Sequence, residues 1–465
     1  MLYFFFPEDI ISPQAPKVIA LAAWMLTWWI TEAAPLPVTA FLPMIGFPFM
    51  GVMKISESTA PYADPIIFLF MGGFMLALAL EKHKLHERIA LKLIRLTGTS
   101  GNGIIFGFMM ATAFISMWIS NSATAMMMLP IGISVVHLTL NNASLPGNIS
   151  NKGQRNFATG LMLCIGYASS LGGLATIIGT PPNVIFVAML NDFFGIKVSF
   201  VQWLIIGFPV AMLLVLVTYF MVTRIILPNG LKKIEGSAEL FEKRLKDLGP
   251  MRKEEKLVLI IFSITASLWI FSSLINDLFN FDLLNDTSIA VMGGLAMFLM
   301  PVDFGKGKFV LHWSDTEKLA WGILFLFGGG LCLAKGLDKS GIVQAVGQWI
   351  AGQNEYTIWL TLLLIVISLV LTELMSNTAV VNVFVPVAFG IASVMEVNPI
   401  LLGLPITLAA GVSVMMPMAT PPNAIVFSSG YIRIQDMIKV GAWLNLVSLI
   451  IIWIFSITVV EWLFG

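Results

Sequence analysis

The same polar motif occurs twice in this chain, each time inside a long apolar stretch. The first copy, residues 116–123, reads Ser-Met-Trp-Ile-Ser-Asn-Ser-Ala, and the second, residues 372–379, reads Thr-Glu-Leu-Met-Ser-Asn-Thr-Ala. A further polar break follows each copy, Gly-Thr-Pro-Pro-Asn at 179–183 and Ala-Thr-Pro-Pro-Asn at 419–423. Lipid cannot satisfy the backbone groups that such residues leave free, so these breaks must be buried in protein or line a cavity. Two matched pairs predict one binding site built from two related halves.

Composition places that site in a membrane. Hydrophobic residues make up 58% of the chain and charged residues 11%, whereas soluble domains carry roughly 25% charged residues. The mean hydropathy is +0.90. Apolar runs such as 203–223, 257–275 and 437–462 reach the length of about 20 residues that a helix needs to cross the hydrocarbon core. They are continuous rather than alternating, so we predict an all-α polytopic membrane protein.

The distribution of basic residues predicts the orientation. Candidate spans lie near 17–33, 36–52, 65–81, 157–194, 203–226, 256–275, 288–302, 319–336, 398–430 and 437–463, and shorter apolar stretches at 103–119, 123–137, 357–374 and 378–394 flank the Ser-Asn motifs. If 82–96 is cytoplasmic, the cytoplasmic side carries 21 of the 26 Lys and Arg residues, in agreement with the positive-inside rule. The linker 227–254 is then cytoplasmic, and the C-terminus is extracytoplasmic.

An internal repeat extends beyond these motifs. The sequence Phe-Leu-Phe-Met-Gly-Gly at 68–73 returns as Phe-Leu-Phe-Gly-Gly-Gly at 325–330. Five full spans begin after the first copy, the fifth being its partner, so the two copies run in opposite directions. Such an inverted-topology repeat is typical of secondary transporters with a site at the membrane midplane. Amphipathic segments follow both copies, at 82–98 and 337–353, and are expected to lie in the membrane interface.

The Ser-Asn motifs are predicted to be the tips of two re-entrant hairpins, 103–137 and 357–394. Arms of about 15–17 residues give roughly 22–26 Å of helix, which is short of a full crossing. The break at Thr180 lies in the middle of its long span. If a tip and a break meet, both lie near the midplane.

The residue types at these breaks suit an anion together with a small cation. Helix N-termini that begin after a break offer free N–H groups and a positive dipole end to an anion. Freed carbonyls and hydroxyl or amide oxygens suit a hard cation. No acidic residue lies in either Ser-Asn triplet or Pro-Pro break, which favours Na⁺ coupling over proton coupling. Glu373 is either a functional intramembrane carboxylate or a group bonded structurally near the tip.

The two cysteines, Cys164 and Cys332, lie in apolar spans. They are expected to be small buried residues rather than a disulfide or a metal site.

At these motifs the sequence resembles the divalent anion/Na⁺ symporter family, the di- and tricarboxylate transporters also called the INDY group. The resemblance rests on Thr-Glu-Ala-Ala-Pro-Leu-Pro-Val-Thr at 31–39, on 68–73, on Leu-His-Glu-Arg-Ile-Ala-Leu at 85–91, and on both Ser-Asn and both Pro-Pro-Asn motifs. It covers nearly the whole chain. It implies Na⁺ as the coupling ion, a homodimer in the lipid bilayer, and a moving transport domain beside a fixed scaffold.

The resemblance also implies the site residues. One Na⁺ site is expected from Ser116, Ser120, Asn121 and the backbone of Gly179, and the other from Thr372, Asn377 and the backbone of Met375 and Ala419. Substrate carboxylates are expected at Ser120, Asn121, Ser122, Thr180, Ser376, Asn377, Thr378 and Thr420. The family pattern is usually Ser-Asn-Thr in both halves, whereas the first half here ends in Ser122. The family also commonly has one more N-terminal helix, which residues 1–16 do not supply.

The expected organisation is scaffold at 1–98, transport part at 99–226, linker at 227–254, scaffold at 255–353 and transport part at 354–465. The expected function is Na⁺-coupled symport of C4-dicarboxylates such as succinate, malate and fumarate across the plasma (inner) membrane, with an elevator movement. The alternatives are transport of citrate, tartrate or sulfate, Na⁺-independent exchange, and an anion channel. We expect no enzymatic activity, because no nucleophile–base pair, metal cluster or nucleotide loop is visible in the sequence, and no nucleic-acid partner.

Overall fold

The computed structural model describes residues 12–31, 33–140, 151–279, 284–351 and 357–460. Nearly all regular structure in these residues is helical, and their only strands, β1 (Pro301–Asp303) and β2 (Lys308–Phe309), pair antiparallel. Seven of the helical stretches that the structure describes are long and apolar enough to cross a membrane. The prediction of an all-α polytopic membrane protein is confirmed.

The helices of the first half and the linker are α1 (Ala15–Thr31), α2 (Leu36–Thr39), α3 (Leu42–Phe49), α4 (Ile55–Thr59), η2 (Ala60–Ala63), α5 (Pro65–Lys82), α6 (Leu85–Leu96), α7 (Gly101–Ser116), α8 (Asn121–Thr139), α9 (Lys152–Gly173), η3 (Ile177–Gly179), α10 (Pro181–Phe194), α11 (Phe200–Phe220) with its π-helical end η4 (Met221–Ile226), and α12 (Ser237–Asp247). Those of the second half are α13 (Lys253–Phe279), α14 (Asp286–Leu299), η5 (Phe304–Lys306), η6 (Trp313–Lys318), α15 (Trp321–Lys339), α16 (Ile342–Ala351), α17 (Thr357–Thr372), α18 (Asn377–Met395), α19 (Ile400–Ala410), α20 (Pro421–Phe427) and α21 (Ile434–Phe455) with its π-helical end η7 (Ser456–Val460).

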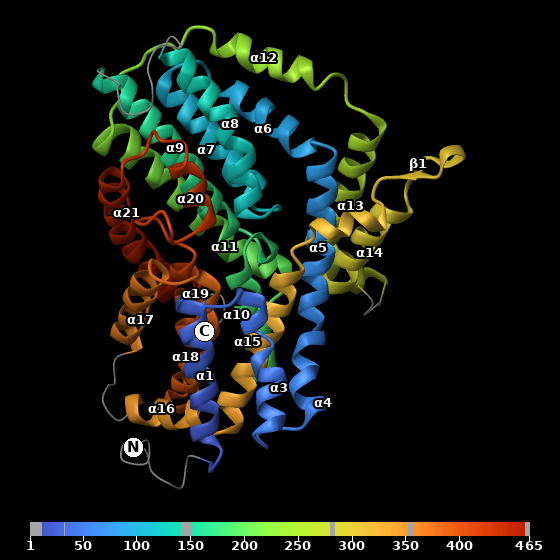
Figure 1. Ribbon diagram of the computed structural model, residues 1–465, viewed down its shortest axis with the longest axis vertical. Helices are drawn as coiled ribbons and strands as arrows, with labels where there is room; N and C mark the ends of the chain where they lie inside the picture. Colours follow the sequence, from blue (N-terminus) through green and yellow to red (C-terminus); the bar gives the residue numbers. More distant parts are fainter. Residues whose placement is uncertain (1–11, 32, 141–150, 280–283, 352–356, 461–465) are drawn as a thin grey trace.

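The two halves run in opposite directions. In Figure 1, α5 runs toward α6 at one end of the molecule, whereas α15 runs toward α16 at the other. The hairpin of α7 and α8 lies toward the first end, with α20 beside it, and the hairpin of α17 and α18 lies toward the second, with α10 and α19 beside it. This is the inverted arrangement predicted from the repeat.

The repeated glycines of α5 and α15 allow the same close helix approach. A Cβ atom on Gly72 would lie 2.4 Å from the backbone of Ala290 in α14. One on Gly329 would lie 2.4 Å from the carbonyl oxygen of Ala40, which follows α2. Because any side chain would collide with backbone at both positions, small residues permit the packing here, as is common in membrane helices.

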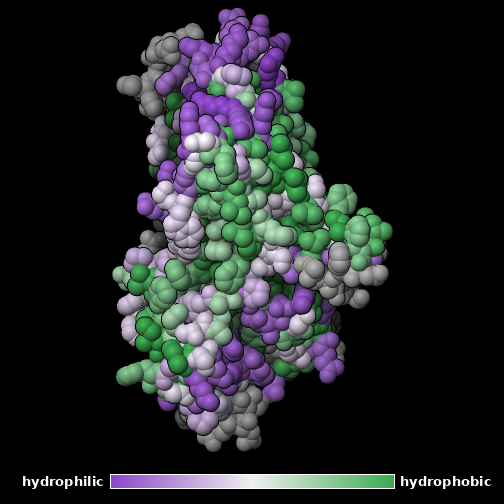
Figure 2. Space-filling view, turned by 90° about the vertical axis from the view of Figure 1, so that its right-hand side faces the viewer, coloured by the Kyte–Doolittle hydropathy of each residue, from purple (hydrophilic) through white to green (hydrophobic). Residues whose placement is uncertain are grey.

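Hydrophobic residues form a broad belt on one face of the molecule (Figure 2). Figure 2 shows this belt across the middle of the face that it draws, with hydrophilic residues gathered at the two ends. The exposed apolar side chains include Phe271 and Leu274 of α13 and Trp443 of α21. A belt of this kind matches the hydrocarbon core of a bilayer.

Polar residues set the starts of several helices. Ser100 accepts a hydrogen bond from the N–H of Gly103 at the start of α7, and Ser199 accepts one from the N–H of Gln202 at the start of α11. Such caps satisfy N–H groups that have no partner within the helix.

The amphipathic helix α6 is tied to the second half by a buried ion pair. Arg88 donates to the carboxylate of Glu255 in α13 at 2.7 Å, and both side chains are buried. Arg88 also donates to the carbonyls of Leu248 and Gly249, at the end of the linker. The pair and these carbonyls together fix where the linker joins α13.

Three details differ from the sequence prediction. The structure adds α4 and η2 between the second and third predicted spans, and it adds the short β1–β2 ladder within residues 301–309. The helices expected at 82–98 and 337–353 begin at Leu85 and Ile342, later than predicted, because α5 and α15 continue to Lys82 and Lys339. The linker contains the short helix α12. Residues 1–11, on which part of the prediction for 1–16 falls, lie outside the described residues.

Candidate functional site

Each Ser-Asn motif forms the tip of a helical hairpin, as predicted. In the first hairpin α7 ends at Ser116 and α8 begins at Asn121, with Ser120 as its N-cap. The Ser120 hydroxyl accepts a hydrogen bond of 3.3 Å from the N–H of Ala123. The first arm has 16 residues, as expected, and the second has 19, slightly more than expected.

The second hairpin repeats this geometry. Here α17 ends at Thr372, α18 begins at Asn377, and the N-cap Ser376 accepts a hydrogen bond of 3.2 Å from the N–H of Ala379. Its arms also have 16 and 19 residues. Both hairpins therefore present a capped helix N-terminus at their tip, with the positive end of the helix dipole directed there.

The Pro-Pro motifs interrupt two further helices. After α9 ends at Gly173, the turn η3 and an extended Thr180 precede α10, whose first residue is Pro181. After α19 ends at Ala410, an extended Thr420 precedes α20. Proline suits the first position of a helix, where its missing N–H is not needed, and it disfavours helix for the residue before it. The motif therefore both ends one helix and begins the next.

At the first tip three oxygen atoms lie close together, and only the hydroxyl of Ser116 supplies a proton for a hydrogen bond among them. The hydroxyl oxygen of Ser116 lies 2.7 Å from the side-chain oxygen of Asn121 and 2.5 Å from the carbonyl oxygen of Ser169. A hydroxyl has one hydrogen, so it donates to only one of these acceptors at a time. The other oxygen pair is then held close without a proton between the two atoms.

The second tip has the same cluster. The hydroxyl oxygen of Thr372 lies 2.8 Å from the side-chain oxygen of Asn377 and 2.7 Å from the carbonyl oxygen of Ala410. Ser116 and Thr372 are both completely buried. Neutral oxygens gathered in this way, short of protons, are the ligand type that a hard cation prefers.

Two glycines leave a small cradle beside the first cluster. A Cβ atom on Gly173 would lie 2.6 Å from the side-chain oxygen of Asn121 and 3.1 Å from the carbonyl oxygen of Gly179. A Cβ on Gly179 would lie 2.4 Å from the carbonyl oxygen of Gly173. The predicted ligands Asn121 and Gly179 are thus brought to one place, and their oxygens fit a small cation. No group of three or more His, Cys, Asp or Glu residues suited to a metal occurs among the residues that the structure describes.

The two halves of the site meet through their breaks. A Cβ on Gly411 would lie 2.3 Å from the side chain of Leu174, so the two broken segments are in direct contact. The helix after each break packs against the opposite hairpin: α10 contacts α18 and α19, and α20 contacts α8 and α9. The polar motifs of both halves therefore gather in one region, as the repeat predicted.

The predicted substrate residues differ in exposure. Thr180, Thr378 and Thr420 are buried, at 4%, 9% and 6% exposure. Half-buried are Asn121, Ser122, Ser376 and Asn377, and Ser120 is exposed. Within the described ranges, the hydrogen bonds of Ser120, Asn121, Ser376 and Asn377 stay inside their own half. The hydroxyl of Thr420 is buried and has no partner there.

Glu373 is bonded structurally. Its carboxylate accepts hydrogen bonds of 2.9–3.1 Å from the N–H groups of Val414, Met415 and Met416, and one of 3.0 Å from the side-chain amide of Asn445. The carboxylate thus satisfies the free N–H groups of the broken segment. The structural interpretation of Glu373 accounts for these contacts.

Several residues that complete the site were not singled out from the sequence. Thr176 donates to the carbonyl of Met117, and Ser413 donates to the carbonyl of Thr372, so each break is tied to its tip. Their signal was weak, because a single Ser or Thr in a membrane helix is common. Cys164 and Cys332 are buried and free, as predicted.

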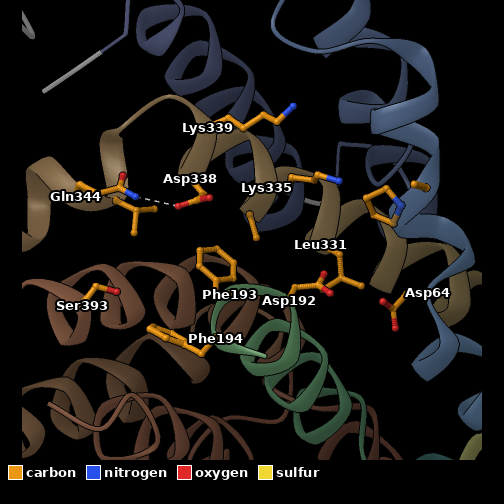
Figure 3. Close-up of a pocket in the computed structure, with 14 residues that line it drawn as sticks. Asp64, Asp192, Phe193, Phe194, Leu331, Lys335, Asp338, Lys339, Gln344 and Ser393 are labelled. Carbon is orange, nitrogen blue, oxygen red and sulfur yellow. Dashed lines mark hydrogen bonds between the residues drawn. The ribbon is translucent and has the colours of Figure 1, made fainter. Parts of the chain in front are cut away.

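A cavity also lies away from these motifs. A space of about 490 Å³ separates α15 and α16 from the ends of α10 and α18. Figure 3 shows Lys335, Asp338 and Lys339 on one side and Asp192 and Phe193 on the other. None of the predicted site residues lines it. The cavity instead lies between the segments predicted as scaffold and those predicted as transport part.

An inverted repeat whose broken helices and hairpin tips meet in the interior is the architecture of a secondary transporter. Comparisons with known proteins agree with that class. All 465 residues match the family described as the sodium:sulfate symporter transmembrane region. The chain is 39% identical over 452 residues to the sodium-dependent dicarboxylate transporter SdcS of Staphylococcus saprophyticus, covering 96% of this chain and 86% of that protein. It is 37% identical to SdcS of Staphylococcus aureus strain USA300, covering 97% and 87%.

Two solved structures share the fold at low sequence identity. The Alcanivorax borkumensis YdaH transporter matches with a TM-score of 0.61 and 14% identity over 96% of this chain and 98% of that chain. MtrF of Neisseria gonorrhoeae, described with a class of antimetabolite efflux pumps, matches with a TM-score of 0.60 and 12% identity over 98% and 97%. This protein belongs to the sodium:sulfate symporter family, which the INDY resemblance had indicated, and it is a transporter rather than an enzyme.

Proposed function

We propose that this protein is a Na⁺-coupled symporter that imports C4-dicarboxylates such as succinate, malate and fumarate. The observation that carries the proposal is the pair of oxygen clusters at Ser116 and Thr372, each beside a capped helix N-terminus. A dicarboxylate has two anionic ends, and the two hairpin tips offer two N-termini for them. The family and the sodium-dependent dicarboxylate transporters among its relatives support the same function.

The residues of the proposed site fall into two sets. The substrate-binding residues are Ser120, Asn121, Ser122, Thr180, Ser376, Asn377, Thr378 and Thr420. The Na⁺ ligands are Ser116, Ser120, Asn121 and the backbone of Gly179 in one half, and Thr372, Asn377 and the backbone of Met375 and Ala419 in the other. The cradle at Gly173 supports the first ion site, and the unpartnered hydroxyl of Thr420 supports a substrate contact.

Uptake of labelled succinate into proteoliposomes tests the function. With an inward Na⁺ gradient we expect concentrative uptake, and with choline or K⁺ in place of Na⁺ we expect none. Equal uptake in all three salts would mean Na⁺-independent exchange or a channel. Sulfate is the second candidate substrate, because the matching family is described by it. Competition by unlabelled sulfate, citrate and tartrate in the same assay separates these anions.

We propose an elevator mechanism, in which residues 99–226 and 354–465 move as the transport part against the scaffold at 1–98 and 255–353. The cavity between α15 and α10 supports this division, because it leaves room between the two parts. A Cβ on Gly73 of α5 would lie 3.6 Å from the Cβ of Ile178 beside the first break, within the range that a disulfide requires.

The double variant Gly73→Cys, Ile178→Cys therefore tests this mechanism, in a background where Cys164 and Cys332 are replaced by Ala. Oxidation should abolish uptake and a reductant should restore it. The two single-cysteine variants are the controls. Full uptake by the oxidised, crosslinked protein would contradict a movement between these two parts.

The proposed setting is the plasma (inner) membrane, with residues 227–254 cytoplasmic, the C-terminus extracytoplasmic, and two copies in a homodimer. The charge distribution supports the orientation, and the family resemblance supports the dimer. Labelling of single cysteines placed at 240 and near the C-terminus in intact cells tests the orientation. Native mass measurement in detergent tests the dimer.

A further inference from the structure

The asparagines of the two Pro-Pro-Asn motifs make the same hydrogen bonds in both halves. The side-chain NH₂ of Asn183 donates to the carbonyls of Gly173 at 3.1 Å and Thr176 at 2.8 Å. The NH₂ of Asn423 donates to the carbonyls of Ser413 at 3.0 Å and Met416 at 3.1 Å. In each half the acceptors lie ten and seven residues before the asparagine. One amide therefore holds together the two ends of each broken segment.

The amide oxygens show that these asparagines are used for their donors. Asn183 and Asn423 are both completely buried, and the oxygen Oδ1 of each has no partner in the described part of the chain. Burying an unpartnered polar atom is unfavourable. Reversing the amide would place Oδ1 against two carbonyl oxygens, which is worse. An apolar residue of the same shape would fill the space but could not donate to the two carbonyls. The two N–H groups are therefore the feature that the site uses.

In the first half the asparagine acts directly on the cradle described above. Asn183 holds the carbonyl of Gly173, and the backbone of Gly173 faces both the side-chain oxygen of Asn121 and the carbonyl of Gly179. Thr176, the second acceptor, donates its hydroxyl to the carbonyl of Met117 at 2.6 Å. The break and the hairpin tip are thereby fixed to one another.

In the second half the connection runs through Ser413. Asn423 holds the carbonyl of Ser413, whose hydroxyl donates to the carbonyl of Thr372 at 2.9 Å. Thr372 in turn contacts the side-chain oxygen of Asn377. Again a single amide fixes the distance between a broken segment and the oxygens of a hairpin tip.

We propose that Asn183 and Asn423 are positioning residues for the coupling ions, each setting the size of the oxygen cage in its own half. This inference rests on the proposed function, since it assigns a role at the same two ion sites. A cage of fixed size favours the ion that fits it, whereas a loosened cage binds more weakly and discriminates less between ions of different radius. Outer residues that orient ligands typically contribute about 10–100-fold to metal affinity.

The test compares Asn183→Leu and Asn423→Leu, which keep the shape and remove the donors, with Asn156→Leu. Asn156 is also buried on α9 and donates to one carbonyl, that of Pro228, which lies outside both breaks. We expect both test variants to raise the Na⁺ concentration for half-maximal uptake about 10-fold or more. We expect the succinate KM at saturating Na⁺ to change much less, and the ratio of Li⁺-driven to Na⁺-driven uptake to rise. Asn156→Leu should leave the Na⁺ midpoint and this ratio unchanged.

Asn183→Ser and Asn423→Ser keep one donor and should give intermediate shifts of the Na⁺ midpoint. They replace the leucine variants in the test if those do not fold. A wild-type Na⁺ midpoint and Li⁺/Na⁺ ratio in the folded variants would overturn the proposal, even if their maximal uptake is reduced. The rise in Tm of the purified protein with added Na⁺ provides a readout without transport. If the wild-type protein shows this increase in Tm but no Na⁺-driven uptake, the proposed function fails. The positioning role is still tested, because the variants should then lose the Na⁺-dependent increase in Tm.

Discussion

The hydroxyl of Thr372 lies 2.8 Å from the side-chain oxygen of Asn377, across the tip of the second hairpin. The same relationship at 2.7 Å joins the corresponding residues of the first hairpin, which runs in the opposite direction. Each hydroxyl also faces a backbone carbonyl from the helix that precedes a break. The hairpin tip and the broken helix of each half are therefore a single polar unit, and two such units meet in the interior.

Replacing the tip asparagines should remove transport without unfolding the protein. Asn121→Ala and Asn377→Ala each delete an oxygen from an ion cluster and a group beside the substrate, while both residues are only half-buried. We expect uptake below about one-tenth of wild type, since each lost polar contact costs about 1–3 kcal/mol and about 1.4 kcal/mol already corresponds to a tenfold change. Uptake assays on purified, reconstituted variants measure this. Wild-type rates in either variant would contradict the site assignment.

Filling the cradle should weaken Na⁺ binding. In Gly173→Ala the new methyl group would lie 2.6 Å from the side-chain oxygen of Asn121, closer than atoms can pack, so the oxygen cage must distort. Gly160→Ala, in the same helix, is the matched control, because its methyl group would meet only side-chain atoms, the nearest being a methyl of Val222 at 3.3 Å. Titration of uptake against Na⁺ should show a raised midpoint for Gly173→Ala and a wild-type midpoint for Gly160→Ala.

The one hydroxyl that differs between the two copies should influence substrate choice. Ser122→Thr makes the first triplet identical to the second, Ser376-Asn377-Thr378. The hydroxyl is kept and a methyl group is added, so the space for substrate shrinks while the oxygen contacts remain. We expect the relative uptake of succinate and bulkier divalent anions to change and the Na⁺ midpoint to stay the same. An unchanged preference across succinate, citrate and sulfate would exclude a selective role for this position.

Glu373 should contribute mainly to stability. In Glu373→Gln one carboxylate oxygen becomes an NH₂ group that faces N–H donors instead of accepting from them. Hydrogen bonds to a charged group contribute about 1.5–3 kcal/mol, so we expect a clear fall in Tm and a less ordered second break. Thermal unfolding in detergent measures it. Glu396→Gln, which makes the same change at an exposed carboxylate after α18, is the control and should lower Tm much less.

Much of the fold could be predicted from the sequence because its determinants are local. Continuous apolar runs require membrane helices, and Ser or Asn before an apolar stretch marks a helix start. The Phe-Leu-Phe-Gly repeat and the duplicated Ser-Asn motif gave the inverted order of the halves. The helix α4 and the β1–β2 ladder were missed, because short elements carry little periodic signal.

The tertiary structure decided which atoms of the site meet. The sequence by itself determined that Asn183 and Asn423 follow Pro-Pro, that the Ser-Asn motifs interrupt apolar stretches, and that the two halves are related. Only the tertiary structure showed that the side-chain amide after each break donates to carbonyls of the same broken segment. It also showed that the hydroxyl at each tip, with a single proton, lies beside two oxygen atoms. Glu373 is the clearest case, because the sequence left it open between a functional intramembrane carboxylate and a structural group. Its contacts with Val414, Met415 and Met416 are made 41–43 residues away along the chain. Contacts over such separations depend on how helices pack in three dimensions, which no local pattern of residues specifies.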